Sequence, residues 1–180
     1  SLAVVGLYSN YYMIINAVQT VFKQIIQATT ASVGNLLVTE NKNKCFDIFK
    51  KIRFLNFWVA CFSSISVLIV MDSFIIIWLG KEYILPEIVL FALVFNLYQK
   101  LMRNVYMSFK EAAGIFHEDR FIPIIEAILN IFFSIVLCRI IGLAGVFLGT
   151  IISGLCLWCY SYPKYVYKNF INIYAEIKLL

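Results

Sequence analysis

Charged residues are scarce in this sequence of 180 residues. Asp, Glu, Lys and Arg together make up 14% of it, against about 25% in ordinary soluble domains. Hydrophobic residues reach 62% and aromatic residues 17%. A soluble fold of this length has too little interior to hide so much apolar surface from water, whereas a lipid bilayer covers it. The shortage of charge therefore excludes an ordinary soluble domain and predicts an integral membrane protein.

The sequence is also poor in groups that carry chemistry. Its single histidine, His117, has no partners with the spacing of a zinc site or a catalytic triad. It has no Walker A sequence, no dinucleotide fingerprint and no H-E-x-x-H motif. The five cysteines include a C-x-x-C pair, Cys156 and Cys159, but that pair falls inside an apolar segment where cysteine packs as a small apolar residue. We expect no enzyme activity, no cofactor and no metal.

Long apolar segments are what the sequence has in place of these motifs. Five of them supply the roughly 20 residues that a helix needs to cross the hydrocarbon, and they are too long for the strands of a membrane barrel. Only helices satisfy their backbone groups in lipid without a partner strand. The sequence therefore predicts an all-α transmembrane bundle with spans at about 2–38, 54–79, 86–109, 121–141 and 143–162.

Basic residues gather in every second connector between these segments. Segment 39–53 is rich in lysine, segment 110–120 contains Lys110 and Arg120, and the tail contains Lys164, Lys168 and Lys178, whereas segment 80–85 contains one lysine and one glutamate. The positive-inside rule places the basic connectors in the cytoplasm, so the protein is expected in the plasma (inner) membrane. The net charge of +5 follows from this topology and implies no nucleic-acid partner. The first residue would then lie outside, which indicates further helices upstream in a longer protein.

The first span has one polar stripe along its length. At helical spacing Asn16, Thr20, Lys23, Gln27, Thr30 and Gly34 share a face, and Gln19 lies at its edge. Burying a lysine near the bilayer centre costs about 2.5–3.5 kcal/mol, a cost that a hydrated cavity or an anionic partner would offset. We therefore expect a cavity suited to a polar, anionic cargo. A helix lying flat at the interface and a polar helix–helix seam are the alternatives.

The third and fourth spans also contain polar positions. On the third span Asn96, Gln99, Lys100, Arg103, Met107 and Lys110 share a face. Its cations either extend to the cytoplasmic surface or form the basic mouth of a cavity that attracts phosphate. On the fourth span Glu126 and Asn130 lie one turn apart. Glu126 would carry a coupling proton or pair with Lys100, Arg103 or a residue outside this sequence.

Glycine is infrequent and its positions are informative. Gly80 and the pair Gly142 and Gly145 indicate tight turns. Gly145, Gly149 and Ser153 repeat every four residues, a spacing of small residues that allows two membrane helices to approach closely.

Several stretches resemble polysaccharide flippases of the O-antigen and capsule type, in the superfamily that also contains multidrug and toxic-compound extrusion transporters. They are VGLYSNYYMIINAV at 5–18, TASVGNLL at 30–37, FIIIWLGKEYILP at 74–86, FKEAAGIFHEDRFIPIIEAILNI at 109–131 and GLAGVFLGTIISGL at 142–155. Together they cover most of the chain in order, and the region 109–155 is the most specific.

The resemblance implies a transporter of two six-helix lobes, in which residues 1–180 form part of the carboxy-terminal lobe and the amino-terminal lobe lies outside this sequence. Such proteins move undecaprenyl-diphosphate-linked oligosaccharide from the inner to the outer leaflet. By this resemblance Lys23, Lys100 and Arg103 meet the diphosphate or sugar acids, and Asn16, Gln19 and Gln27 bond sugar hydroxyls. A drug or metabolite exporter on the same fold is the main alternative. A membrane scaffold or a polysaccharide polymerase fits less well, because the outer connectors are short.

Overall fold

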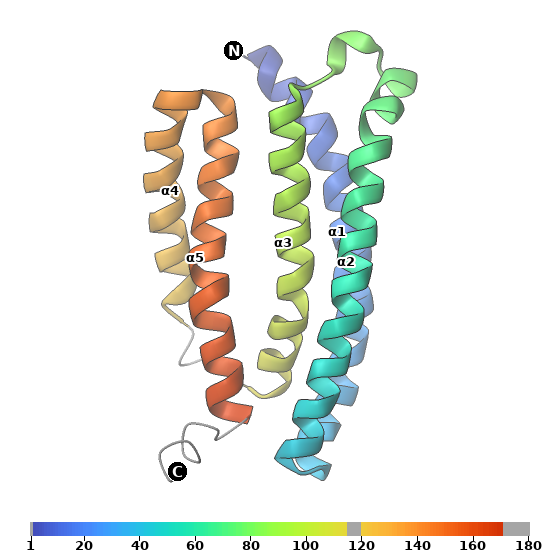
Figure 1. Ribbon diagram of the computed structural model, residues 1–180, viewed down its shortest axis with the longest axis vertical. Coiled ribbons are helices and arrows are strands. Elements are labelled where there is room, and N and C mark those ends of the chain that lie inside the picture. The colour runs from blue at the N-terminus through green and yellow to red at the C-terminus, as the bar shows by residue number, and fades with distance from the viewer. Residues whose placement is uncertain (1, 115–119, 171–180) are drawn as a thin grey trace.

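The computed structural model describes residues 2–114 and 120–170, and its secondary structure over these ranges is entirely helical. The elements are α1 (Leu2–Thr39), α2 (Lys42–Trp78), the short 3-10 helix η1 (Lys81–Tyr83), α3 (Glu87–Ala112), α4 (Ile122–Ile141) and α5 (Leu143–Phe170). The five long helices run up and down beside one another, with α3 between the pair α1 and α2 and the hairpin α4–α5 (Figure 1). The expected all-α class is therefore confirmed.

The helices extend beyond several of the expected spans. α2 begins at Lys42 rather than near residue 54, and α5 continues to Phe170 rather than ending near residue 162. Asn41 caps the start of α2, because its side chain accepts a hydrogen bond of 2.9 Å from the Lys44 backbone N–H. At 1.5 Å per residue, the 38 residues of α1 span about 57 Å, which exceeds a hydrocarbon core of about 30 Å.

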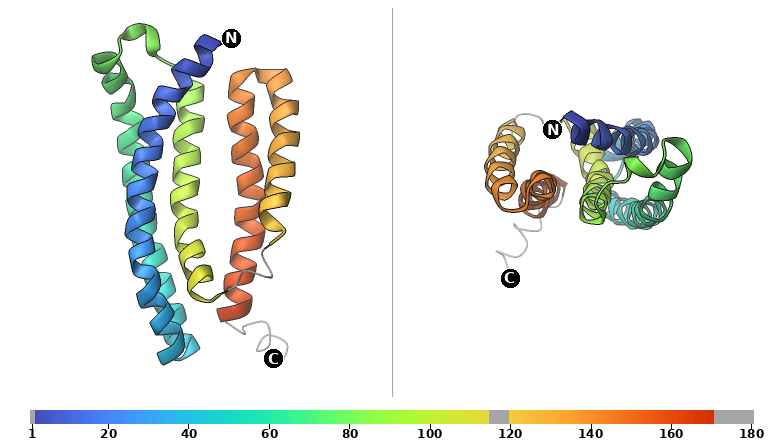
Figure 2. Two further views of the ribbon diagram at one scale, coloured as in Figure 1. Left: turned by 180° about the vertical axis from the view of Figure 1, so that it is seen from behind. Right: turned by 90° about the horizontal axis from the view of Figure 1, so that it is seen from above.

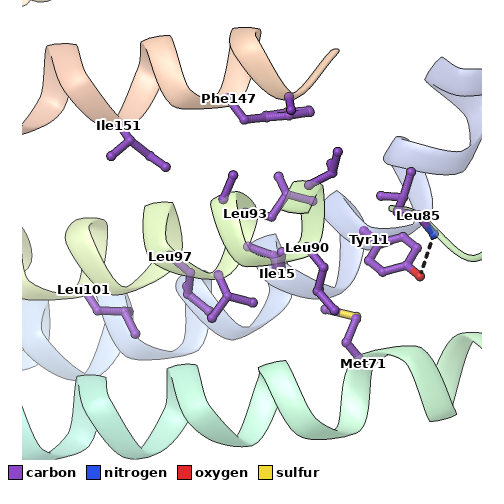
Figure 3. Packing of buried hydrophobic residues seen from close by; sticks show 14 of the residues in the cluster. Tyr11, Ile15, Met71, Leu85, Leu90, Leu93, Leu97, Leu101, Phe147 and Ile151 are labelled. Atoms are coloured by element: carbon purple, nitrogen blue, oxygen red, sulfur yellow. Dashed lines mark hydrogen bonds between the residues drawn. The ribbon is translucent and has the colours of Figure 1, made fainter. Parts of the chain in front are cut away.

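The main core surrounds α3. Its buried residues include Tyr11 and Ile15 of α1, Leu93 and Leu97 of α3, and Phe147 of α5, which pack together in Figure 3. A smaller cluster lies toward the end of α3, where Phe49, Tyr106 and Phe109 meet edge to face at 5.0–5.4 Å between ring centroids. Burial of these side chains fixes α1, α2 and α5 against α3.

Small residues allow α4 and α5 to pack backbone to backbone. A Cβ on Gly149 would lie 2.6 Å from the Ser134 backbone nitrogen, and one on Gly145 would overlap the Leu137 carbonyl group. The close approach expected from this spacing is therefore present. Gly142, with φ of 69°, makes the turn between the two helices. Gly145, expected at that turn, lies inside α5 instead, because the turn needs only one residue.

Much of the apolar surface remains uncovered. α2 and α4 are long and apolar enough to cross a membrane, with mean hydropathy of 2.2 and 2.3 over their most apolar windows. Only 28% of the window in α2 and none of that in α4 is buried. The core helix of a soluble protein would be mostly buried, so these two helices indicate membrane association by composition and length.

The two ends of the bundle differ in charge. α1 ends and α2 begins at the same end at which α3 ends and α4 begins, as both side views show (Figures 1 and 2). η1 and the turn between α4 and α5 lie at the opposite end. The basic segment 39–53 and the basic residues Lys110 and Arg120 thus belong to one end, here called the inner end, and the other is called the outer end.

Candidate functional site

A polar cavity of about 280 Å³ lies between α1, α3 and α4, and we call it the inner cavity. Figure 2 shows α1 and the α4–α5 hairpin on either side of α3. Its lining residues come from three helices: Gln19, Lys23, Ile26 and Gln27 from α1, Lys100, Arg103, Asn104, Met107, Ser108 and Glu111 from α3, and Glu126 from α4. The fold therefore brings together six of the residues selected from the sequence, namely Gln19, Lys23, Gln27, Lys100, Arg103 and Glu126.

The charges in the inner cavity are only partly compensated. Arg103 and Glu126 form an ion pair of 2.7 Å that joins α3 to α4, and both side chains are about one-quarter exposed. Lys100 is half-buried and Lys23 is exposed. Within the described ranges neither lysine forms a hydrogen bond or an ion pair. The cavity consequently presents two lysine ammonium groups to any ligand that enters it, against the remaining carboxylate of Glu111.

Asn104 also lines the inner cavity and was not selected from the sequence. It follows Lys100 by one helical turn, so the spacing could have identified it. Its Nδ2 atom is buried and has no hydrogen-bond partner in the part of the chain that the structure describes. A buried donor without a partner costs about 1–3 kcal/mol, and an acceptor atom of a ligand would remove that cost.

A hydrogen bond fixes the wall between α1 and α3. The hydroxyls of Thr30 and Ser108 lie 2.9 Å apart and join the two helices beside the cavity. Thr30 belongs to the polar stripe expected on α1, so that part of the stripe faces α3. The polar stripe of α1 thus lines a cavity and also contributes to a polar helix–helix contact, so the two alternatives expected for it are both present in part.

Some residues of the expected polar stripes lie elsewhere. Asn16 and Thr20 are exposed and line none of the described cavities, and the Thr20 hydroxyl donates to the Asn16 carbonyl at 2.7 Å. Gln99 is buried and donates to the Ile151 carbonyl of α5 at 3.3 Å. Lys110 is buried at the inner end of α3. The polar faces of α1 and α3 are thus rotated relative to the expected stripes.

A second cavity of about 400 Å³, the outer cavity, lies between α1, α3 and α5. Asn96 and Lys100 line it, and Lys100 therefore borders both cavities. Asn130 lines neither and donates to the Ser153 hydroxyl at 3.3 Å, so that it joins α4 to α5. The other candidate positions thus divide between two neighbouring cavities and the α4–α5 interface.

The side chains of the inner cavity include groups that bind anions. Among the described residues, no three His, Cys, Asp or Glu side chains cluster in a way that would hold a metal ion. His117 lies outside the described residues. The lining contains groups that bind phosphate and hydroxyl oxygen atoms. They are two free lysine ammonium groups, the Asn104 amide and the carboxamides of Gln19 and Gln27. Comparison of the chain with protein-family models, with curated proteins and with solved structures finds no match.

Proposed function

We propose that this chain is part of a membrane transporter that flips lipid-diphosphate-linked oligosaccharide from the inner to the outer leaflet. The observation that carries the proposal is the inner cavity, which presents Lys23 and Lys100 without ionic partners among the described residues. Such a cavity inside an apolar helical bundle suits a ligand that is anionic at one point and lipidic elsewhere. The resemblance of five segments to polysaccharide flippases supports the same substrate class.

All five long helices cross the membrane in this proposal. The exposed apolar side chains of α2 and α4, such as Ile69, Ile77, Ile128 and Ile131, would face lipid. The basic inner end would lie in the cytoplasm of a plasma-membrane protein. The inner cavity would then be reached from the cytoplasmic leaflet, where lipid-linked glycans are assembled.

The transport step would proceed by alternating access. The diphosphate would bind Lys23 and Lys100, and the amides of Gln27 and Asn104 would donate to its oxygen atoms. The lipid chain would stay in the bilayer. Rocking of this lobe against a second lobe would expose the ligand to the outer side, with no covalent bond made or broken.

The charge of the inner cavity favours this proposal over the exporter alternative. A pump for cationic drugs would need a carboxylate that is free to meet its substrate. Glu126 is engaged by Arg103 at 2.7 Å. Glu111 is the other carboxylate of the lining, and Lys23 and Lys100 outnumber it, so the lining is positive overall.

The test uses a strain that lacks the protein, complemented with the native protein or with Lys23→Ala. Surface polysaccharide and lipid-linked oligosaccharide of the inner leaflet are measured in each strain. Deletion is expected to trap oligosaccharide inside. Lys23→Ala is expected to restore less than about one-tenth of the export, which corresponds to a loss of at least about 1.4 kcal/mol. Lys51→Ala, which removes an exposed lysine outside the cavity, serves as the control and should restore export fully.

Either of two results would contradict the proposal. If deletion leaves both glycan pools unchanged, the protein is not the flippase. If Lys23→Ala is expressed normally and exports as well as Lys51→Ala, Lys23 does not bind the substrate.

A further inference from the structure

The outer cavity is built differently from the inner one. Tyr8 and Tyr12 of α1 and Phe147 of α5 line it. The ring of Tyr8 lies 4.9 Å from that of Phe147 and 5.6 Å from that of Tyr12, measured between centroids. The three rings therefore form one aromatic wall that connects α1 to α5.

Polar groups border this wall. Asn96 is half-buried, and its carboxamide makes no hydrogen bond within the described part of the chain. The Thr150 hydroxyl donates to the Val146 carbonyl at 3.1 Å, which leaves the lone pairs of its oxygen free to accept. The cavity thus offers donors and acceptors next to apolar ring faces, with little charge apart from Lys100.

This combination matches the chemistry of a sugar ring. A pyranose presents C–H groups on its faces, which pack against aromatic rings, and hydroxyl groups at its edge, which need hydrogen-bond partners. A volume of about 400 Å³ is near the lower limit of ligand sites, about 300–1,000 Å³. It suits a single sugar residue rather than a whole oligosaccharide.

Lys100 sets the position of that sugar relative to the phosphate. It borders the inner cavity with Lys23 and the outer cavity with Asn96. A phosphate bound by Lys100 would therefore have its next covalently attached group within reach of the aromatic wall. Asn96 precedes Lys100 by one helical turn on α3, so the two side chains project from the same face.

We propose that the outer cavity is a binding subsite for the sugar residue attached directly to the phosphate that Lys100 binds. The inference rests on the proposed function and adds a recognition element to it. The sugar stacks on Tyr8 and Tyr12 and forms hydrogen bonds with Asn96 and Thr150. The substrate is thereby oriented with its phosphates toward the inner end and its first sugar toward the outer end.

The test measures binding of two kinds of probe to the protein in lipid nanodiscs. One probe is farnesyl diphosphate. The others carry a single glucose, galactose, N-acetylglucosamine or N-acetylgalactosamine residue on the terminal phosphate. The native protein is expected to bind at least one glycosylated probe about tenfold more tightly than farnesyl diphosphate.

Variants then separate the two cavities. Tyr12→Leu and Asn96→Leu are each expected to remove most of the tenfold preference while changing the affinity for farnesyl diphosphate less than about twofold. Lys23→Ala should weaken the binding of all the probes. Phe95→Leu, which alters an exposed aromatic residue of α3 outside both cavities, should leave every affinity unchanged.

The subsite is overturned if no glycosylated probe binds more tightly than farnesyl diphosphate. It is also overturned if Tyr12→Leu and Asn96→Leu weaken the glycosylated and bare probes equally. Failure of the proposed function is detected by a different measurement, made in cells. In that case deletion of the protein would leave both glycan pools unchanged, whatever the probes bind.

Discussion

At the scale of single residues, the ion pair between Arg103 and Glu126 balances charge inside a largely apolar bundle. Glu126→Gln would leave the Arg103 guanidinium with less compensation in a partly buried site. We expect the variant to lower the free energy of unfolding by about 1–3 kcal/mol. The measurement is the thermal unfolding midpoint of the purified protein in detergent.

The matched comparison removes both partners of this pair. Arg103→Met combined with Glu126→Gln should be less destabilised than the sum of the two single variants, because no uncompensated charge remains. If the loss in the double variant equals the sum of the losses in Arg103→Met and Glu126→Gln, the two side chains do not interact in the folded protein.

Tyr11 is a second residue whose hydroxyl joins separate elements. It is fully buried, donates to the Asp72 carboxylate at 2.9 Å and accepts from the Leu85 backbone N–H at 3.2 Å. Tyr11→Phe leaves both groups without this partner, so we expect a loss of about 1–3 kcal/mol. Hydrogen exchange at the Leu85 amide should accelerate as well. Tyr12→Phe, which changes an exposed neighbour, should stay within about 0.5 kcal/mol of the native protein.

The candidate site also shows what a sequence predicts at this scale. The spacing of Lys23, Gln27, Lys100 and Arg103 was enough to place them on polar faces. A helical wheel fixes angles only within one helix, whereas the rotation of that helix is set by side chains of its neighbours. For this reason Gln19, expected at the edge of the stripe, lines the cavity, whereas Asn16, expected within the stripe, lies outside the cavity.

At the scale of elements, the α4–α5 hairpin depends on the absence of side-chain atoms at Gly149. A Cβ at this position would lie 2.6 Å from the Ser134 backbone nitrogen, an atom that cannot move without shifting α4. We expect Gly149→Ala to destabilise the protein by about 1–3 kcal/mol, read from the thermal unfolding midpoint. Gly34→Ala provides the control, since nothing lies within 4 Å of a Cβ at that position, and it should be neutral or slightly stabilising.

The ends of the helices were the least predictable feature of the elements. Hydropathy identifies the residues that are apolar enough for the hydrocarbon, so it predicts that the second span starts at about residue 54. The helix itself begins at Lys42, because the Asn41 cap and the Lys44–Glu40 and Lys50–Asp47 ion pairs stabilise a charged helical extension. Hydropathy and charge predict where the apolar membrane segment ends, but they do not predict how far the helix continues beyond that segment.

At the scale of the whole molecule, the two ends of the bundle should lie on opposite sides of the membrane. The five long helices alternate in direction, so one topology assigns a side to every connector (Figure 1). Lys51 at the inner end and Lys81 at the outer end are both exposed, and each is a suitable position for a single labelling cysteine.

The corresponding experiment labels Lys51→Cys and Lys81→Cys in spheroplasts and in inverted membrane vesicles, with a maleimide that does not cross membranes. We expect Lys81→Cys to react in spheroplasts and Lys51→Cys to react only in inverted vesicles, with a difference of at least about tenfold between sides, because the positive-inside rule would keep the basic segment around Lys51 in the cytoplasm. The native protein, whose described cysteines are all free, gives the background. Labelling of both variants from the same side would contradict the transmembrane bundle. Labelling of each variant from the opposite side would agree with a transmembrane bundle. It would contradict the proposed orientation, because the inner cavity would then face away from the leaflet that contains the newly made glycan.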